Sequence, residues 1–227
     1  SDMRKSDIVR YHNIDPQRID VVYNGVDLKR FHPDNKSKYR KVMREKLSLG
    51  EEFIVLYISN NFRLKGLLTL IKSLGELKKS GRDFKALIIG RGNEVPYRKL
   101  AKKLGCLDNL IFLGHVGEIE KYYAASDLYV HPTFYDSCSL VTTESLASGL
   151  PVITTVFDGA SGIMEDGKDG FVMGDPKDYK GLAEKISFFF DDEFRHKASI
   201  AAREKAEKYP AEKNCEEIIE IYKEVVA

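Results

Sequence analysis

The sequence is poor in cysteine and in features that would point to a membrane or to nucleic acid. Its three cysteines, Cys106, Cys138 and Cys215, lie far apart without Cys-x-x-Cys spacing. This argues against a zinc site or a disulfide framework and indicates a reducing, cytosolic compartment. Lys and Arg (36) balance Asp and Glu (35) to a net charge of +1, so no basic excess points to nucleic acid. No apolar run approaches the roughly 18 residues of a membrane-spanning helix, and the first five residues precede no apolar segment of the kind found in a secretion signal.

Hydrophobic residues nevertheless make up 43% of the 227 residues, which is enough for a substantial core. Short apolar runs without polar alternation are separated by amphipathic segments, the pattern of a parallel sheet covered by helices on both faces. We therefore predict an α/β fold, a Rossmann-like doubly wound parallel sheet with C-terminal helices. The expected strands are residues 20–23, 53–58, 84–89, 110–113, 128–131 and 151–155. The expected helices are residues 4–12, 36–49, 67–80, 96–104, 118–125, 140–148, 178–191, 193–208 and 211–226.

Ligands of such sheets bind beyond the carboxyl ends of the strands, so the loops that follow the predicted strands are candidate sites. The loop 59–66 brings Arg63 and Lys65 next to Gly66 at the expected start of a helix. Two cations and the free N–H groups of a helix N-terminus suit an anion, most naturally a phosphate. The alternative is that both are ordinary surface cations beside a helix.

A glycine-containing loop follows the strand 84–89. Gly90-Arg91-Gly92 matches the dinucleotide fingerprint G-x-G-x-x-G only at its first two glycines. Because the third glycine is missing and the loop follows an interior strand, we expect a tight strand-to-helix turn here. The sequence also lacks the G-x-x-x-x-G-K-[ST] loop of nucleotide hydrolases. A Rossmann dehydrogenase that binds NAD is therefore the weakest functional hypothesis.

The segment 131–153 carries the densest group of polar residues. Ser139 suits the N-cap of the helix 140–148, so the N–H groups of Leu140 and Val141 would point out of the carboxyl edge of the sheet. Asp136 precedes this helix, and Glu144 lies about one turn inside it. Carboxylates accept hydrogen bonds from vicinal hydroxyls and would match a sugar or a ribose. The alternative, a loop aspartate and a solvated helix glutamate, stays equally open.

Two histidines lie at strand ends. We interpret His131, which closes the apolar run 128–131, as a core histidine with satisfied hydrogen bonds rather than a catalytic group. His115, which follows Gly114, is interpreted in the same way. The sequence gives no local support for a Ser-His-Asp or Cys-His arrangement and shows no metal-ligand spacing.

The order of these pieces resembles one known family over nearly the whole chain. It is similar to the C-terminal, donor-nucleotide-binding half of a GT-B fold retaining glycosyltransferase of family 4, also called group 1. The stretch 135–140 (YDSCSL) looks most like the lipopolysaccharide-core glucosyltransferases. The other matching segments are 21–33 (VVYNGVDLKRFHP), 63–66 (RLKG), 88–92 (IIGRG), 100–105 (LAKKLG), 111–116 (IFLGHV), 123–127 (YAASD) and 149–153 (GLPVI).

The resemblance implies roles for the residues that match the family motifs. The family carries two glutamates separated by seven residues, and here Asp136 and Glu144 have that separation, with the shorter aspartate in first place. Asp136 would meet hydroxyls of the donor sugar, and Glu144 would hold the ribose. Arg63 and Lys65 would neutralise the diphosphate leaving group in place of a metal. The remaining implied donor contacts are backbone groups of Ser139, Leu140 and Val141 at the sugar and diphosphate, Gly90 and Arg91 in the substrate-binding loop, and His115 and Val116 against the base.

The same resemblance divides the chain and implies what it binds. Residues 1–25 look like a remnant of the N-terminal acceptor domain and linker, residues 26–208 like the donor-binding domain, and residues 209–227 like a helix that packs on the N-terminal domain. The implied reaction transfers a sugar with retention from a nucleotide-diphosphate sugar, with UDP favoured, to a glycan or lipid-linked glycan of the lipopolysaccharide type. No cofactor, metal or nucleic acid takes part. The implied location is the cytoplasm, with peripheral attachment of the full-length enzyme to the inner face of the membrane.

A whole family member has two such domains with the active site between them. The isolated chain is therefore expected to bind the donor without efficient transfer, because nothing orients an acceptor or excludes water. Two other interpretations stay open. One is a non-catalytic nucleotide-sugar-binding module that keeps the fold, and the other is a nucleotide-sugar epimerase of similar architecture, whose motifs match less well.

Overall fold

The computed structural model describes residues 1–226, and their centre is a six-stranded sheet. In space the strands run β3-β2-β1-β4-β5-β6, and every neighbouring pair is parallel. This is the doubly wound, Rossmann-like order, which reverses direction between β1 and β4. The predicted fold class is therefore confirmed. The strands are β1 (Phe53–Ile58), β2 (Phe84–Ile89), β3 (Leu110–Gly114), β4 (Leu128–Val130), β5 (Val152–Thr155) and β6 (Gly170–Met173).

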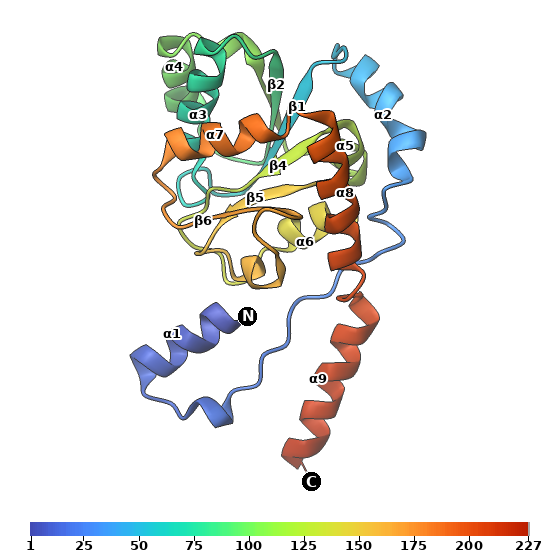
Figure 1. The fold of residues 1–227 in the computed structure, drawn as a ribbon. Coiled ribbons are helices and arrows are strands. Elements are labelled where there is room, and N and C mark those ends of the chain that lie inside the picture. Colours follow the sequence, from blue (N-terminus) through green and yellow to red (C-terminus); the bar gives the residue numbers. More distant parts are fainter. Residues whose placement is uncertain (227) are drawn as a thin grey trace.

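Helices cover both faces of the sheet (Figure 1). One face carries α3, α4 and α7, and the other carries α2, α5 and α6. The long helix α8 contributes Ala198 to the first core and Ala202 to the second. The bounds are α2 (Asn35–Lys46), α3 (Leu67–Lys79), α4 (Val95–Lys103), α5 (Glu120–Ala125), α6 (Leu140–Ala147), α7 (Tyr179–Phe188) and α8 (Asp192–Ala206). The 3-10 turns η1 (Pro16–Arg18), η2 (Leu107–Asn109) and η3 (Gly159–Ile163) lie in the connections.

Strand β1 shows why the sheet has no polar alternation in its sequence. Val55 and Tyr57 face the core beneath α3, whereas Ile54 and Leu56 face the core beneath α6. All four are 0% exposed. A strand that is covered on both faces needs apolar side chains on both, so the run reads as continuously hydrophobic.

The sequence pattern does not predict β6, which is the largest difference between expectation and structure. The strand has only four residues, and a run this short cannot be told from a loop by periodicity. It forms because it pairs with β5 at the sheet edge. Gly170 packs so closely there that a Cβ would lie 1.8 Å from the carbonyl oxygen of Val152. The other five sheet strands, and the helices, agree with the prediction to within a few residues.

The predicted strand 20–23 is wrong. These residues are extended, but they pair with no strand among residues 1–226. Next to them, Val26 forms an isolated bridge with Pro210, and Asn214 Nδ2 donates to the carbonyl oxygen of Tyr23 at 2.7 Å. A strand needs a ladder of backbone partners, which apolar composition alone does not supply.

The two terminal helices project from the same side of the α/β body (Figure 1). Helix α1 (Asp2–His12) contacts η3, whereas α9 (Ala211–Val226) extends away from the sheet. The exposed side chains of α9 include Ile218, Ile219 and Tyr222. Among the helices of residues 1–226, none combines the length and the apolar character that crossing a membrane requires.

The N-terminal segment also touches the loop between β4 and α6. Ser1 Oγ donates to the carbonyl oxygen of Ser137 at 2.6 Å, and Asn24 Nδ2 donates to that of Cys138 at 3.1 Å. Residues 1–25 are therefore attached to the body rather than separate from it. Their assignment as a remnant of another domain stays a prediction.

Candidate functional site

The candidate site lies at the carboxyl edge of the sheet, where the strand order reverses. The loops after β1 (59–66) and β4 (131–139) flank this switch point, the usual ligand-binding place of open α/β sheets. The first loop supplies Lys65, and the second supplies His131, Asp136 and Ser139.

Backbone contacts hold the two loops together. The N–H of Phe134 donates to the carbonyl oxygen of Leu64 at 2.9 Å. Gly66 has a φ of +75°, and a Cβ at this position would lie 1.9 Å from the carbonyl oxygen of Pro132. Only glycine permits such a close approach of two backbones. This approach fixes where Lys65 lies relative to the loop between β4 and α6.

Lys65, Asp136 and His131 form one connected group. Lys65 Nζ lies 2.6 Å from Asp136 Oδ2 and donates to the carbonyl oxygen of Tyr135 at 2.8 Å. His131 Nε2 lies 3.3 Å from the same Oδ2. Burial acts to raise the pKa of Asp136, but the hydrogen bonds from His131 and Lys65 outweigh it and hold the pKa below its ordinary value. The carboxylate is therefore anionic and is shared by an ammonium and an imidazole.

His131 differs from its sequence interpretation. It is buried as expected, with 2% exposed, but its Nδ1 has no hydrogen-bond partner in the described part of the chain. Its Nε2 faces Asp136. The expectation of a core histidine with satisfied hydrogen bonds is therefore wrong. A turn brings position 136 back over the strand end, since the N–H of Tyr135 donates to Thr133 Oγ1 at 3.1 Å.

The N-terminus of α6 is capped as predicted. Ser139 Oγ accepts from the N–H of Thr142 at 3.2 Å. A buried carboxylate, Asp158, adds a second brace, because it accepts from the N–H of Ser139 at 3.2 Å and from Thr142 Oγ1 at 2.7 Å. The N–H of Ser139, which the resemblance offers to the donor, is therefore already bonded. The N–H groups of Leu140 and Val141 have no partner among residues 1–226 and are available to an anion.

Glu144 lies one turn inside α6 and points towards α5. Its Oε2 accepts from the hydroxyl of Tyr123 at 2.8 Å, and the side chain is half-buried. Burial raises the pKa of Glu144 above its ordinary value, although the bond from Tyr123 acts to lower it. The other oxygen, Oε1, has no hydrogen-bond partner within residues 1–226. A solvated helix glutamate is therefore the wrong interpretation, and Oε1 can accept from hydroxyl groups.

Within residues 1–226, Arg63 forms no ion pair with Asp136. It is exposed and stands at the rim of an apolar cavity of about 470 Å³. This cavity lies beside the two loops of the site, because Leu64 and Phe134, which are hydrogen-bonded to each other, both line it. The other lining residues are Leu64, Leu68, Pro96, Tyr97 and Phe134.

The remaining predicted residues follow β2 and β3. Gly90 has a φ of +133°, and a Cβ there would lie 1.7 Å from the carbonyl oxygen of Ser59, which confirms the tight turn. Arg91 is exposed beside it. His115 and Val116 line a separate cavity of about 400 Å³ against α2. The His115 side chain is exposed, so its interpretation as a core histidine is wrong. The structure therefore joins Lys65 and Asp136 directly. The residues that follow β2 and β3 lie farther along the same edge of the sheet.

Three polar side chains of the site were missed by the sequence reasoning or given no role in it. Asp158 accepts from the N–H of Ala160 at 2.9 Å, so the sequence Asp158-Gly-Ala is an N-cap signal that could have revealed it. Tyr123 carries no such signal, because its hydroxyl meets Glu144 only through the packing of α5 on α6. The role of His131 depends on a turn that periodicity does not show.

No three His, Cys, Asp or Glu side chains within residues 1–226 lie together in a way that could hold a metal ion. The positive charge nearest to Asp136 is the ammonium of Lys65. That the chain works without a metal stays a prediction.

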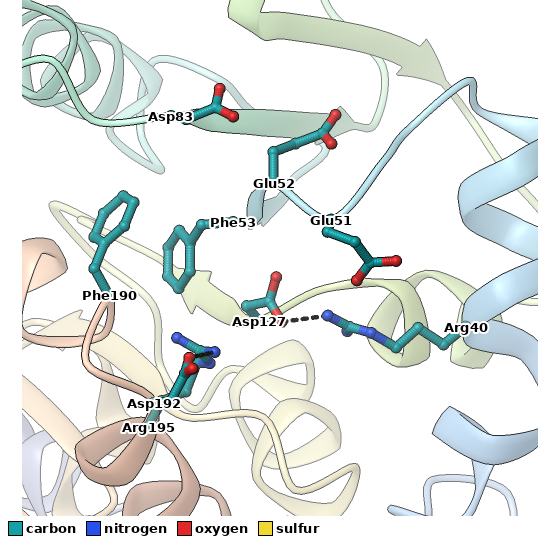
Figure 2. A pocket seen from close by; sticks show the side chains of 9 residues that line it. All are labelled: Arg40, Glu51, Glu52, Phe53, Asp83, Asp127, Phe190, Asp192 and Arg195. Carbon is teal, nitrogen blue, oxygen red and sulfur yellow. Dashed lines mark hydrogen bonds and ion pairs between the residues drawn. The ribbon is translucent and has the colours of Figure 1, made fainter.

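A cavity of about 620 Å³ lies at the opposite, amino edge of the sheet (Figure 2). Phe53 begins β1, and Asp83 and Asp127 immediately precede β2 and β4, which places all three at that edge. The cavity is distant in the fold from the loops that hold Lys65 and Asp136. Its other lining residues are Arg40, Glu51, Glu52, Phe190, Asp192 and Arg195.

Two ion pairs of this second cavity serve the fold. Arg40 lies 2.6 Å from Asp127, and Arg195 pairs with Asp192 (Figure 2). Asp127 also accepts from Arg44 and from the N–H of Ile54, both at 2.8 Å, and so ties α2 to β1. Paired charges of this kind are a structural tie, so the cavity is not the candidate site.

Comparison with known proteins identifies the family of the chain. A family model described as glycosyl transferases group 1 matches residues 39–208. The lipopolysaccharide glucosyltransferase WaaG of Escherichia coli is 26% identical over 188 residues, which cover 82% of this chain and 50% of WaaG. The chain spans about half the length of the curated relatives it matches.

Solved structures show the same fold. A glycosyltransferase from Rickettsia africae superposes with a TM-score of 0.89 at 25% identity, over 100% of this chain and 62% of that one. Anabaena HepE in complex with UDP-glucose gives a TM-score of 0.87 at 22% identity, over 99% of this chain and 62% of HepE. Since the family model covers most of the chain, the chain belongs to the group 1 glycosyl transferases.

Proposed function

We propose that the chain is the C-terminal, donor-binding half of a glycosyltransferase and holds a nucleotide-diphosphate sugar, in the first place a UDP-sugar. The observation that carries the proposal is the arrangement at the β1/β4 switch point. Lys65 and the N-terminus of α6 lie at one edge with Asp136 and Glu144. A cation and a helix N-terminus suit a diphosphate, and carboxylates suit ribose and sugar hydroxyls. The similarity in fold to HepE, whose structure holds UDP-glucose, supports UDP as the nucleotide.

Each residue then has a separate task. Lys65, with Arg63 from the neighbouring position of the loop, neutralises the diphosphate and stabilises it as it leaves. The N–H groups of Leu140 and Val141 bind its oxygens or those of the sugar. Asp136 accepts from the sugar and Glu144 from the ribose. The loops of Gly90 and Arg91 and of His115 and Val116 line the nucleotide and its base.

The reaction itself needs the other half of the enzyme. We infer that the longer protein transfers the sugar with retention, as a family 4 enzyme, to a glycan or lipid-linked glycan. The similarity to WaaG supports a lipopolysaccharide-type acceptor. The exposed apolar side chains of α9 suit a helix that packs on an N-terminal domain. In this proposal the enzyme works in the cytoplasm, attached peripherally to the membrane, and needs no metal because Arg63 and Lys65 supply the positive charge.

A non-catalytic nucleotide-sugar-binding module is the second candidate. It is favoured by one observation: the carboxylate in the first glutamate position of the motif is an aspartate, and its Oδ2 is occupied by Lys65 and His131. The shorter side chain has less reach towards a sugar. In this case the chain would bind UDP-sugar, but the longer protein would not turn it over.

A thermal-shift titration with UDP, GDP, ADP and NAD, with and without magnesium, tests donor binding. A ligand that binds only the folded chain adds about 2.7 kcal/mol of stability at a hundredfold excess over its dissociation constant. We expect a shift with UDP that does not need magnesium. A shift with NAD alone would contradict the proposal. The absence of a shift with all four ligands would also contradict it.

Glu144→Gln should weaken the UDP shift, because hydrogen bonds from ribose hydroxyls to a neutral amide are weaker than those to an ionised carboxylate. Glu184→Gln is the matched control, since Glu184 is an exposed glutamate on α7, on the other side of the sheet. It should leave the shift unchanged. If the longer protein turns over the UDP-sugar and Glu144→Gln abolishes this turnover, the result supports the enzyme over the non-catalytic binding module.

A further inference from the structure

The buried imidazole of His131 has no role in the proposed function so far. The backbone N–H of His131 donates to the carbonyl oxygen of Ile153 on β5 at 2.7 Å. Its carbonyl oxygen accepts from Thr154 Oγ1 at 3.1 Å and from the N–H of Thr133 at 2.7 Å. The ring stacks on Tyr129 with a centroid separation of 5.8 Å and an interplanar angle of 18°. The imidazole is therefore held at the strand end by contacts that do not involve Asp136.

The contact with Asp136 decides which nitrogen carries the hydrogen. A neutral imidazole has one N–H and one lone pair, and an ionised carboxylate only accepts. If the hydrogen were on Nδ1, the Nε2 lone pair would face the carboxylate oxygen 3.3 Å away, and a buried N–H would have no acceptor in the described part of the chain. With the hydrogen on Nε2, His131 donates to Asp136, and only a lone pair is left without a partner. The second arrangement costs less, because a buried donor without an acceptor carries the full desolvation penalty.

Two donors from different strands then share one carboxylate oxygen. Lys65 Nζ, from the loop after β1, and His131 Nε2, from the end of β4, both lie within hydrogen-bond reach of Asp136 Oδ2. The other oxygen, Oδ1, has no hydrogen-bond partner among residues 1–226. A carboxylate that is held at one oxygen by two donors cannot rotate freely, so its free oxygen has a fixed position.

We propose that His131 is a positioning residue, which holds Asp136 as the Nε2–H tautomer so that Oδ1 is presented to a hydroxyl of the donor sugar. The part concerning the sugar rests on the proposed function. The aspartate is one methylene shorter than the glutamate that the family motif carries, so a fixed position matters more here than for a longer, flexible side chain. Lys65 alone could not fix it, because the ammonium is a point charge on a flexible stem.

The first test uses the unmodified chain. The nitrogen chemical shifts of ¹⁵N-labelled histidine distinguish a protonated from a bare ring nitrogen, and the chain has only five histidines to assign. We expect His131 to carry its hydrogen on Nε2 and to show a bare Nδ1. A hydrogen on Nδ1 with a bare Nε2 would overturn the proposal, whether or not any nucleotide binds.

The second test compares two variants with one control. His131→Leu removes the donor, whereas the amide nitrogen of His131→Gln can take the place of Nε2. Tyr129→Phe is the control, since it removes a buried hydroxyl without a partner from the ring stacked on His131. NMR titration of the Asp136 carboxyl carbon should show a higher pKa in His131→Leu than in the wild type, and an unchanged one in His131→Gln and Tyr129→Phe. Equal titration in His131→Leu and the wild type would overturn the proposal.

Calorimetry with UDP and with UDP-glucose tests the link to the sugar. In the proposed function Asp136 contacts the sugar and not the nucleotide, so the UDP affinity should stay the same in all the variants. The ratio of UDP-glucose to UDP affinity should fall roughly three- to tenfold in His131→Leu, the size expected when a charged hydrogen bond is weakened, and recover in His131→Gln. An unchanged ratio would overturn the positioning role. If the wild type bound neither ligand, the proposed function would fail, while the nitrogen shifts and the Asp136 titration would still decide the role of His131.

Discussion

Lys65 and Asp136 are 71 positions apart in the sequence, yet Lys65 Nζ lies 2.6 Å from Asp136 Oδ2 across the switch point of the sheet. Both side chains are 19% exposed, so the pair is partly shielded from water. In the proposed function the ammonium meets the diphosphate and the carboxylate meets the sugar of the same donor. The ion pair therefore sets the distance between the two groups before the donor binds, which lowers the cost of ordering them.

Replacing Asp136 by asparagine should lower the free energy of unfolding at pH 7 by about 1.5–3 kcal/mol, the usual worth of a hydrogen bond to a charged group. The pKa of Asp136 is lowered in the folded chain, so this contribution is complete above the ordinary aspartate pKa of about 3.9. It is lost as the pH falls through the lower, folded value. Urea unfolding of the wild type and of Asp136→Asn, at pH 7 and then in acid, measures the difference, which should close only in acid.

The exposed pair between Lys79 and Glu76 provides the control. It has a similar distance, 2.8 Å, but its side chains on α3 are more open to solvent, with Lys79 61% and Glu76 33% exposed. Glu76→Gln should cost less than about 0.5 kcal/mol, because exposed ion pairs contribute little. Losses of equal size in the two variants would show that the Lys65–Asp136 pair is no more than another surface contact.

Glu144→Gln should make the chain more stable at neutral pH while it weakens nucleotide binding. Burial raises the pKa of Glu144 in the folded chain, so its ionised form is less favourable there than in the unfolded chain. The resulting penalty is absent below the ordinary glutamate pKa and is complete above the raised folded value. Thermal unfolding should therefore give a higher midpoint for Glu144→Gln at pH 7, and equal midpoints in acid. A lower midpoint at pH 7 would mean that the bond from Tyr123 outweighs burial.

The sequence was sufficient for five of the six strands of the sheet and for the loops that carry the site, because long apolar runs and helical spacing record burial directly. It failed at β6 and at residues 20–23 for one common reason. Whether a short extended segment becomes a strand depends on a neighbour with free backbone groups. Gly170–Met173 finds that neighbour in β5, and residues 20–23 find none among residues 1–226.

The contacts of the site could likewise be predicted only in part. The N-cap at Ser139 could be predicted, because it depends on residues close in sequence. The bond that Asp158 makes to the N–H of Ser139, the contact of His131 with Asp136 and the bond from Tyr123 to Glu144 could not. Each joins side chains through a turn or through helix packing, so residue types and spacing do not record it.

Gly66→Ala should disrupt the site as well as the fold. A Cβ at Gly66 would lie 1.9 Å from the carbonyl oxygen of Pro132, so the loops of Lys65 and Asp136 would have to separate. Gly81→Ala is the matched control, since Gly81 has the same φ of +75° but no atom within 4 Å of the added Cβ. In the control, the free energy of unfolding should fall only by the cost of a left-handed alanine backbone, roughly 1–2 kcal/mol. Urea unfolding should show a larger loss for Gly66→Ala, and equal losses would mean that the loops can part without cost.

Substitution of two buried carboxylates at opposite edges of the sheet should distinguish an effect on stability from an effect on nucleotide binding. Asp127, 8% exposed, holds Arg40 and Arg44 at the amino edge, whereas Asp158, 0% exposed, holds the N-terminus of α6 at the carboxyl edge. Asp127→Asn should lower the free energy of unfolding by about 3 kcal/mol or more, because the buried Arg44 loses its counter-charge. Asp158→Asn should lower it by about 1.5–3 kcal/mol, because the hydrogen bonds from Ser139 and Thr142 then go to a neutral amide in place of a charged carboxylate.

The affinity for UDP should distinguish the two variants. The N–H groups of Leu140 and Val141 are aimed by the α6 N-terminus that Asp158 braces, so Asp158→Asn should weaken UDP binding by roughly tenfold, the equivalent of one lost hydrogen bond. Asp127→Asn should leave the UDP affinity unchanged at a temperature at which both variants are folded, since its contacts tie α2 to β1 at the far edge. Isothermal calorimetry measures both affinities. An equal loss in the two variants would mean that UDP binding follows global stability, and the reverse pattern would place the nucleotide at the amino edge, in the cavity of Figure 2.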